Sequence, residues 1–160
     1  MAIITNESDF EYAGFWVRVG ATLIDIFLQI LITMPPLVAI YGWSYFENNS
    51  FSAGVWDFFI TYVALPIIVI TFWIYYQATP GKMAVGAKIV DARTGGKPSN
   101  GQFIGRYFAY FVSILPLMIG IFWIAFDKRK QGWHDKLAGT VVIKLKNNGS
   151  EEVHFEYKKE

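Results

Sequence analysis

Three long apolar stretches divide the chain, at residues 15–41, 55–76 and 103–126. Each is at least as long as the ~20 residues that a helix needs to cross the hydrocarbon core of a bilayer. The polar residues between them gather in two loops and in the segment that follows the third stretch. The pattern therefore predicts an all-α integral membrane protein with three long hydrophobic helices.

A stripe of polar side chains follows one face of the first predicted helix. Between positions 16 and 34 the polar residues are Arg18, Thr22, Asp25, Gln29 and Thr33. At ~100° per residue, these positions fall within a sector of roughly 80°. Charges inside lipid are costly, so such a face normally points at a partner, a cavity or a pathway. The stripe is the first candidate for a functional site.

The stripe allows three interpretations. In the first, Arg18 extends to the lipid headgroups and Asp25 is a hydrogen-bonded packing residue between helices. In the second, Asp25 binds a cation or carries a proton, with Thr22 and Gln29 as neutral ligands one turn to either side. In the third, the stripe recognises the membrane helices of another protein. The sequence leaves all three open.

Charged residues elsewhere offer partners for this stripe. Arg106 enters the third stretch from the same side as Asp25, and a buried charge is stabilised by a counter-charge, so we expect these two to pair. Asp57 lies at the opposite interface and is predicted to be a solvated helix cap. Lys82 follows a Pro-Gly turn and is predicted to extend to the headgroups.

Basic residues are distributed unevenly over the loops. The loop at residues 42–54 has no Lys or Arg, whereas residues 77–102 carry Lys82, Lys88, Arg93 and Lys97. The positive-inside rule therefore puts the second loop and the amino terminus in the cytoplasm. A full third crossing would put the basic segment after residue 126 outside. Either the rule is overridden there, or the third stretch breaks at Pro116 and returns as a re-entrant pair of half-helices.

Two short segments favour the re-entrant alternative for the third stretch. Residues 87–91 and 140–146 are rich in β-branched side chains and flanked by glycines, as expected of strands. They can pair if both lie in the cytoplasm. The membrane domain would then comprise residues 1–146, and the polar tail at residues 147–160 would be a frayed end or an extra edge strand.

Composition excludes several classes of protein. Of the 160 residues, 54% are hydrophobic and 17% are charged. A soluble domain of this size is not expected to have this composition. The net charge of +1 gives no reason to expect a nucleic-acid partner. The chain has no Cys, so disulfides and thiolate metal sites are excluded.

No set of residues in the sequence suits catalysis. The dipeptide His134-Asp135 suggests a metal hydrolase, but the one other histidine is His154 and no spaced carboxylates complete a site. A Ser-His-Asp triad, paired catalytic carboxylates and a glycine-rich cofactor loop are likewise missing from the sequence. We therefore expect no enzyme and no bound metal or cofactor. Asp135 is expected to bond backbone amides or Arg129 at the membrane face.

Several motifs together resemble the RDD family of small bacterial membrane proteins, which is named for one arginine and two aspartates. They are AGFWVR at residues 13–18 before Asp25, TPGK at 79–82 with KIVD at 88–91, Arg106, and QGWHD at 131–135 with AGTVV at 138–142. The resemblance implies that Arg18 is the family's arginine, that Asp25 is its first aspartate and that Asp135 or Asp91 is its second. It also implies a multi-pass protein of the bacterial inner or plasma membrane. The family has no established general activity, although some members have been proposed to exchange cations for protons.

The polar face of the first helix carries the functional prediction. We expect transport of an ion, a proton or a small solute near Arg18 and Asp25, through an oligomer because three short helices can hardly enclose a pathway. The alternative is a non-transporting adaptor or assembly subunit that binds other membrane helices through the same face. The candidate site residues are Arg18, Thr22, Asp25, Gln29, Arg106 and Asp135. The expected partners are the lipid bilayer, a second copy or another membrane protein, and a monovalent cation or proton.

Overall fold

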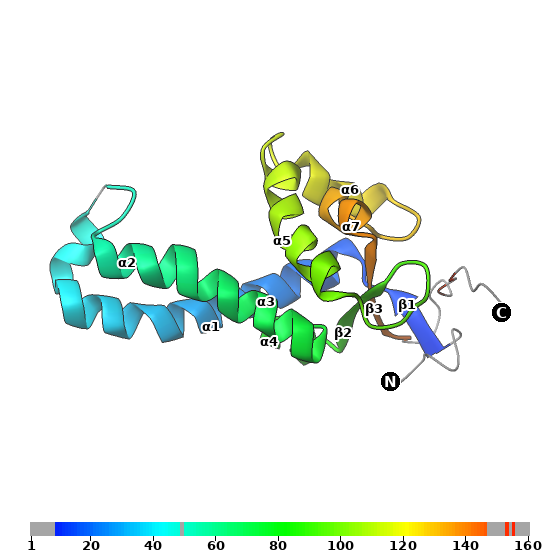
Figure 1. Cartoon of the computed structure of the whole chain (residues 1–160), viewed down its shortest axis with the longest axis horizontal. Helices are drawn as coiled ribbons and strands as arrows, with labels where there is room; N and C mark the ends of the chain where they lie inside the picture. The colour runs from blue at the N-terminus through cyan, green and yellow to red at the C-terminus, as the bar shows by residue number, and fades with distance from the viewer. Residues whose placement is uncertain (1–8, 49, 147–152, 154, 156–160) are drawn as a thin grey trace.

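The computed structural model describes residues 9–48, 50–146, 153 and 155, and Figure 1 shows their arrangement. The elements, in chain order, are β1 (Phe10–Tyr12), α1 (Phe15–Tyr41), the 3₁₀ helix η2 (Trp43–Glu47), α2 (Val55–Phe59), the π-helical turn η3 (Ile60–Ala64), α3 (Leu65–Tyr76), α4 (Pro80–Ala84), β2 (Ala87–Asp91), α5 (Asn100–Ile114), α6 (Ile119–Phe126), α7 (Trp133–Ala138) and β3 (Thr140–Leu145). The protein is therefore mostly helical, with a small sheet.

Two long apolar helices form an antiparallel hairpin that extends away from the rest of the molecule (Figure 1). α1 has 27 residues, and α2, η3 and α3 form one continuous helix of 22 residues. Both are long and apolar enough to cross a membrane, which agrees with the first two predicted spans. Few of their side chains are buried inside the chain, so their surfaces are left to face lipid or other helices.

The second helix of the hairpin contains a π-helical turn. η3 lies directly before Pro66, whose ring nitrogen has no hydrogen to donate to the helix. Prolines and π-helical turns are both recognised causes of local irregularity in helices. The helix ends at Gln77, which is left-handed (φ 58°) and donates its amide to Trp73 O at 2.9 Å.

The third apolar stretch is not one long helix. α5 and α6 are bent by 99° relative to each other, and Pro116 lies in the turn between them. Leu117 and Met118 have positive φ angles of 51° and 62° in this turn. The third stretch is therefore divided at Pro116, the break expected for it as an alternative to one straight helix, and its bend fits either a broken span or a re-entrant loop.

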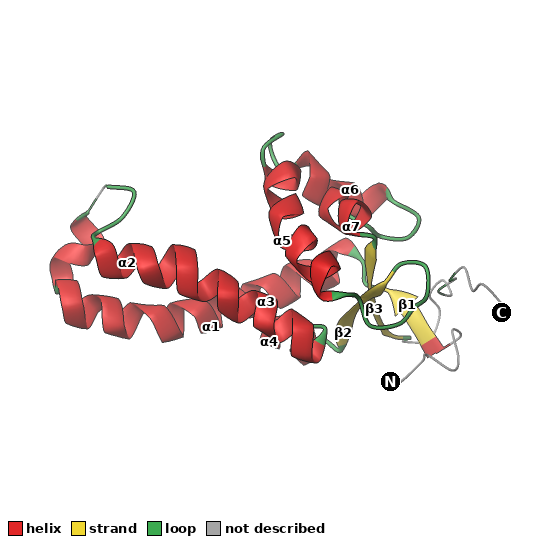
Figure 2. Cartoon of the chain, in the orientation of Figure 1, coloured by secondary structure: helices red, strands yellow, loops and turns green. Residues whose placement is uncertain are grey.

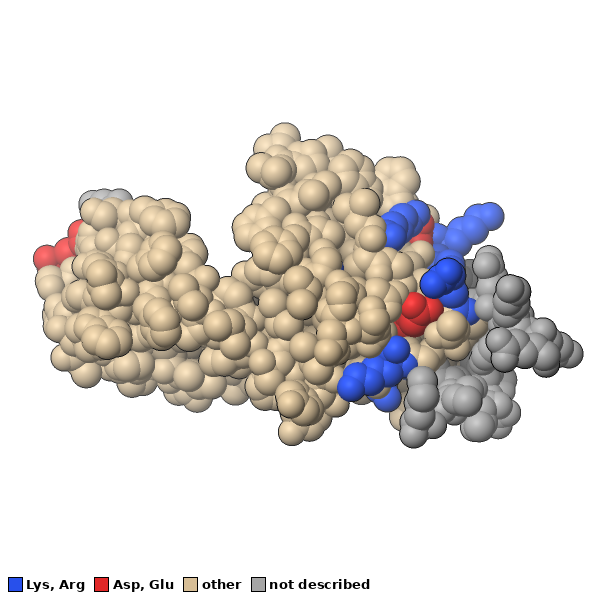
Figure 3. All heavy atoms as spheres, viewed as in Figure 1, with Lys and Arg blue, Asp and Glu red and all other residues tan. Residues whose placement is uncertain are grey.

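Three strands from distant parts of the chain form one antiparallel sheet in the order β1-β3-β2 (Figure 2). The pairing of β2 with β3 is as predicted, with Val90 opposite Val141. β1 was not predicted, and it pairs with the other edge of β3. Because β1 and β2 both pair with β3, the segments before α1, after α4 and after α7 lie together at one end of the molecule. The Lys and Arg side chains visible in Figure 3 gather at this end.

The sheet separates two apolar clusters. The first joins the sheet to α3 and α5 and comprises Ala13, Trp73, Ala87, Ile89, Phe103 and Val142. The second comprises Val90, Ala92, Val141, Ile143, Val153 and Phe155. Val153 and Phe155 thus pack with residues of β2 and β3, while the rest of the predicted polar tail lies outside the described residues. The first cluster fixes α5 above the sheet, next to the base of the hairpin.

Candidate functional site

Three charged side chains from three helices meet at the base of the hairpin. Arg18 of α1 has its Nη1 2.6 Å from Oδ2 of Asp135, in the first turn of α7. Arg106 of α5 has its Nη1 in contact with the other carboxylate oxygen, Oδ1. Asp135 and Arg106 are fully buried, and Arg18 is nearly so. The carboxylate of Asp135 in α7 therefore links this helix to both α1 and α5.

The remaining donors of Arg18 bind backbone carbonyls. Its Nε donates to Ala13 O at 2.9 Å and its Nη2 donates to Lys130 O at 2.5 Å. A buried guanidinium needs such acceptors, since an unmade hydrogen bond in a dry site is costly. Every nitrogen of the Arg18 guanidinium is thus occupied by the protein itself.

Asp135 is an ionised carboxylate in the interior. Its Oδ2 also accepts a hydrogen bond from the amide of Gly132 at 3.1 Å, so the prediction that it bonds a backbone amide is confirmed. Burial alone would raise the pKa of Asp135, but the Arg106 and Arg18 guanidiniums outweigh burial and hold the pKa well below its usual range. Arg129, the other expected partner, donates to the carbonyl of Ala92.

Arg106 lies in a mixed polar and aromatic environment. Its Nη1 donates to Thr140 Oγ1 at 2.7 Å, and its Cζ lies 5.6 Å from the ring of Trp73 and 5.9 Å from the ring of Tyr110. Both rings are within the range of cation–π attraction. Within the part of the chain that the structure describes, Arg106 Nε and Nη2 have no hydrogen-bond acceptor.

Asp25 does not pair with Arg106, which corrects the sequence prediction. Its Oδ2 accepts from Thr79 Oγ1 at 2.5 Å and its Oδ1 accepts from the amide of Gly81 at 2.6 Å. The carboxylate of Asp25 therefore binds the amino-terminal end of α4. The acidic partner of Arg106 is Asp135 of α7. This contact needs a glycine, because a Cβ at Gly81 would overlap the carbonyl of Ala21.

Lys82 is buried rather than extended to the headgroups. Only 8% of the residue is exposed, and its Nζ has Thr79 Oγ1 as a distant acceptor at 3.5 Å. No ion pair of Lys82 is found among the described residues. Burial lowers the pKa of this lysine, with the nearby Tyr110 acting in the opposite direction. Nζ of Lys82 is thus buried and has unused donors among the described residues.

His134 completes the polar core of the site. Its ring stacks on Tyr110 at a centroid distance of 3.9 Å, and its Nδ1 lies 3.2 Å from Ser113 Oγ. Burial lowers the pKa of His134 to about 3, so the ring is neutral at physiological pH. A group of three or more potential metal ligands is not found in the described residues.

A cavity of about 390 Å³ lies beside this cluster, between α1 and the α5–α6 pair. Its polar lining residues are Arg18, Thr22, Lys82, Tyr110 and His134. Its apolar lining residues are Phe15, Val19, Leu23, Ile114, Met118, Ile121, Phe122 and Ile124. A concave site with mostly apolar walls and a few convergent polar groups is typical of small-molecule binding sites.

The polar stripe of α1 is divided among different surroundings. Arg18 and Thr22 line the cavity, whereas Asp25 faces α4. Gln29 is exposed on the outer surface of the hairpin, and its carbonyl accepts from Thr33 Oγ1 at 2.9 Å. The six predicted site residues therefore do not form one site: Arg18, Arg106 and Asp135 meet, Thr22 lies on the adjoining cavity wall, and Asp25 and Gln29 lie elsewhere.

Asp91 and Asp57, the two other aspartates considered from the sequence, have structural partners. Asp91 accepts from Gln102 Nε2 at 2.6 Å and from the amides of Arg93 and Thr94, both at 2.9 Å, so it shapes the turn after β2. Asp57 lies in the first turn of α2, is buried and accepts from the amide of Ala53 at 2.9 Å, so it holds the segment before the helix and is not the solvated cap that was predicted.

The site as a whole includes residues outside the six predicted ones. Ser113 and Tyr110 have the helical spacing that puts them on the same face of the third stretch as Arg106, and this spacing is their signal in the sequence. Lys82 was expected at the headgroups, and its burial accompanies the close packing of Gly81 on α1, which the sequence alone does not show.

These observations define a small helical membrane protein whose first long apolar helix is joined to α5 of the bent α5–α6 pair by a buried Arg–Asp–Arg cluster. The sequence profile of the RDD family matches residues 12–139, a range that contains both hairpin helices and the whole cluster. The chain therefore belongs to the RDD family. No solved structure matches it significantly.

Three curated relatives are similar to this chain. The uncharacterized protein YxaI of Bacillus subtilis (strain 168) is 32% identical over 82% of this chain and 96% of its own length. The uncharacterized membrane protein YteJ of the same organism is 30% identical over 82% of this chain and 80% of its own. The uncharacterized protein RP437 of Rickettsia prowazekii (strain Madrid E) is 49% identical over 75 residues, which span 47% of this chain and 41% of that protein.

Proposed function

We propose that this protein binds a small solute inside the membrane and takes part in its transport as an oligomer. The observation that supports the proposal is the cavity of about 390 Å³ with charged residues at one end. Buried charges in membrane proteins are costly and usually serve a binding site or a pathway. The RDD family and the two apolar spans support a location in the membrane, and the basic sheet end is expected to face the cytoplasm.

The charges around the cavity favour a solute that is anionic over one that is a cation. Arg18 and Lys82 line the cavity, and the carboxylate of Asp135 is already shared between two arginines. The oxygens of Asp25, the expected cation or proton site, accept hydrogen bonds from Thr79 and Gly81. A cation would therefore meet two positive groups and no free carboxylate in this cavity.

Passage across the bilayer requires more than one copy. The cavity is bounded by the charged cluster, and two spans with one re-entrant pair cannot enclose a continuous path. The exposed amide of Gln29 on the apolar hairpin favours association, because side-chain amides in membrane helices bond across helix interfaces.

Currents from proteoliposomes on a solid support test this function. The probes are concentration jumps of acetate, octanoate, inorganic phosphate and Na⁺, together with pH jumps, applied to the wild type, Lys82→Gln, Asp25→Asn and Lys88→Gln. Lys88 is an exposed lysine of β2 and serves as the matched control. We expect a current with at least one anion that falls about tenfold or more in Lys82→Gln and persists in Lys88→Gln, since a lost charge-assisted contact of ~1.4 kcal/mol is tenfold in affinity.

Other outcomes would refute the proposal. A current driven by Na⁺ or by pH alone, abolished by Asp25→Asn and unchanged in Lys82→Gln, would identify a cation or proton pathway instead. The absence of current under every gradient would exclude transport of these probes and leave the second candidate function.

That second candidate is a non-transporting adaptor, favoured by the exposed Gln29 on a hairpin that packs on little of its own chain. It requires Gln29 to lie in a contact with another membrane helix. Gln29→Leu should then reduce crosslinking to a second copy or to a partner in native membranes, while Thr71→Leu should not, because the exposed Thr71 hydroxyl already bonds Ile67 O of its own helix at 2.7 Å. Equal crosslinking of the two variants would exclude this role for Gln29.

A further inference from the structure

We infer that the cavity binds a single-chain amphiphile with one negative charge, such as a medium-chain fatty acid, with its carboxylate on Lys82 and its chain along α5 and α6. The inference rests on the proposed function in one respect, namely that this cavity is the binding site. It adds the chemical class of the occupant and the side from which the occupant enters.

The head group is assigned from the unused donors of Lys82. Lys82 lines the cavity and is 8% exposed, and its Nζ has Thr79 Oγ1 at 3.5 Å as its acceptor among the described residues. Arg18 cannot take this role as readily, because its three nitrogens are bound to Ala13 O, Asp135 and Lys130 O. A buried ammonium is stabilised by a counter-charge with which it also forms hydrogen bonds.

The balance of charge favours a monoanion. Asp135 lies between Arg18 and Arg106, and Asp25 accepts from the segment that carries Lys82. These side chains together carry three positive and two negative charges, so one negative charge on the occupant makes the site neutral. A carboxylate has this charge, whereas a phosphate monoester near pH 7 carries more.

The tail is assigned from the walls of the cavity. Beyond the polar end, the lining consists of aliphatic, methionine and phenylalanine side chains of α1, α5, α6 and the turn between them. Its volume of about 390 Å³ equals roughly 13 water volumes at ~30 Å³ each. Because a methylene group is similar in size to a water molecule, the cavity suits a chain of about a dozen carbons.

The entrance points to the bilayer as the source of the occupant. Leu23, Met118 and Phe122 line the cavity and are themselves 61%, 46% and 51% exposed, so the cavity reaches the surface among apolar side chains. The charged end, by contrast, is buried. A water-borne anion such as phosphate would have to cross this apolar entrance, whereas the chain of an amphiphile is stabilised by it.

Photolabelling in nanodiscs of zwitterionic lipid tests the inference. The probe is dodecanoate with a diazirine near its methyl end, and its matched control is the alcohol with the same chain and diazirine. We expect the acid to label residues 114–124 at least about fivefold more than the alcohol does. Lys82→Gln should remove this preference, Lys82→Arg should keep it, and Lys88→Gln should leave it unchanged.

Several results would overturn the inference. They are equal labelling by acid and alcohol in the wild type, an unchanged preference in Lys82→Gln, and competition by inorganic phosphate as strong as that by unlabelled dodecanoate. If Lys82→Gln does not fold, as judged by its thermal unfolding, the comparison of acid, alcohol and the corresponding dodecyl amine on the wild type decides, since the amine should label least. Selective labelling without any proteoliposome current would refute transport and retain the amphiphile site, whereas anion currents without selective labelling would do the reverse.

Discussion

Asp135 is the acidic partner that two buried arginines share. Arg18 and Arg106 approach its two carboxylate oxygens from different helices, and neither has a second acidic partner among the described ion pairs. A buried pair contributes little compared with well-packed apolar residues, but removing one partner leaves a desolvated charge. The cluster is thus a point where a single substitution has a large effect.

We predict that Asp135→Asn destabilises the folded protein by about 3–5 kcal/mol, because both arginines lose their counter-charge. Chemical unfolding in detergent micelles, followed by near-UV circular dichroism, measures the effect. The control is Lys136→Gln, which removes the more exposed ion pair between Lys136 and Asp127 and should change stability by no more than about 1 kcal/mol. Similar losses in both variants would contradict a special role for the cluster.

His134 makes the stability of the fold sensitive to acid. Burial holds its pKa at about 3 in the folded protein, against ~6.5 in an unfolded chain. Between these values the unfolded chain binds a proton that the folded protein does not, so stability falls as the pH is lowered below ~6.5, by up to ~1.4 kcal/mol per pH unit.

We therefore predict that the unfolding temperature of the wild type drops more between pH 7 and pH 4.5 than that of His134→Asn. The asparagine has no proton to gain and keeps a polar group near Ser113. Thermal unfolding in detergent at a series of pH values provides the measurement, and parallel curves for the two proteins would rule out the assignment.

The charged residues of the site could be identified from the sequence more easily than their partners. Arg18, Arg106 and Asp135 were recognisable as charges in or beside apolar segments, but their pairing was not, because it depends on where α7 inserts. Arg106 was expected beside Asp25, and only the packing of Gly81 on α1 explains why Asp25 is already satisfied. The burial of Lys82 follows from the same contact.

Among the elements, the α5–α6 pair depends on a close approach of two backbones. A Cβ added at Gly120 would lie 2.7 Å from Ser113 Cα, so α6 can fold back on α5 only if this residue has no side chain. The hydroxyl of Ser113 accepts a hydrogen bond from the amide of His134 at 2.9 Å, and this bond joins α5 to α7.

Gly120→Ala should therefore open the helix pair, whereas Gly105→Ala should be neutral or slightly stabilising, since nothing lies within 4 Å of a Cβ there and alanine favours a helix by up to ~1 kcal/mol. Limited proteolysis near residues 115–118, together with thermal unfolding, compares the two variants. Equal resistance to protease would contradict the close packing of α6 on α5.

Elements differed in how well the sequence predicted them. α1 and the α2–η3–α3 helix were predicted at their observed ends, because hydropathy over 20 or more residues is a strong signal. The two glycine-flanked strands were predicted as well. β1 was missed because three residues cannot show an alternating pattern, and it forms only against β3 from the far end of the chain. The turn at Pro116 remained an alternative, since a proline in an apolar run is compatible with a kink or a return.

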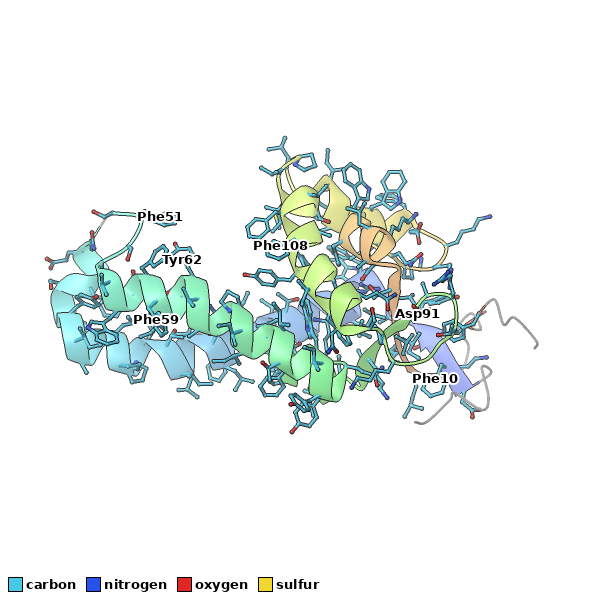
Figure 4. The ribbon with its side chains drawn as sticks, viewed as in Figure 1. Phe10, Phe51, Phe59, Tyr62, Asp91 and Phe108 are labelled. Carbon is cyan, nitrogen blue, oxygen red and sulfur yellow. The ribbon has the colours of Figure 1, made fainter. Side chains whose placement is uncertain are left out.

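For the whole molecule, the sheet decides which segments share a side of the membrane. β1 and β2 are both bonded to β3, so the loops that follow β2 and α6 lie at the same end, opposite the loop of the hairpin (Figures 1 and 4). In Figure 4, Phe51, Phe59 and Tyr62 mark the loop end of the hairpin, whereas Asp91 and Phe10 mark the sheet end.

Single cysteines test this topology without interference, because the native chain has no Cys. We predict that Lys97→Cys and Lys128→Cys react alike with a membrane-impermeant maleimide in intact cells, and that Ser50→Cys reacts oppositely. If the basic end is cytoplasmic, only Ser50→Cys is labelled before lysis. Opposite labelling of Lys97→Cys and Lys128→Cys would require a full third crossing and would contradict the bent pair.

The position of Asp135 along the chain also affects the order of assembly. Arg18 precedes it by 117 residues, so the ribosome delivers the first arginine, and later Arg106, well before the carboxylate that both require. During synthesis, Arg18 must therefore stay near water or the headgroups. The arrival of α7 then supplies the carboxylate with which both guanidiniums are buried, before β3 completes the sheet. An interrupted chain that lacks this short helix would keep two exposed arginines at the membrane, which a quality-control protease could recognise.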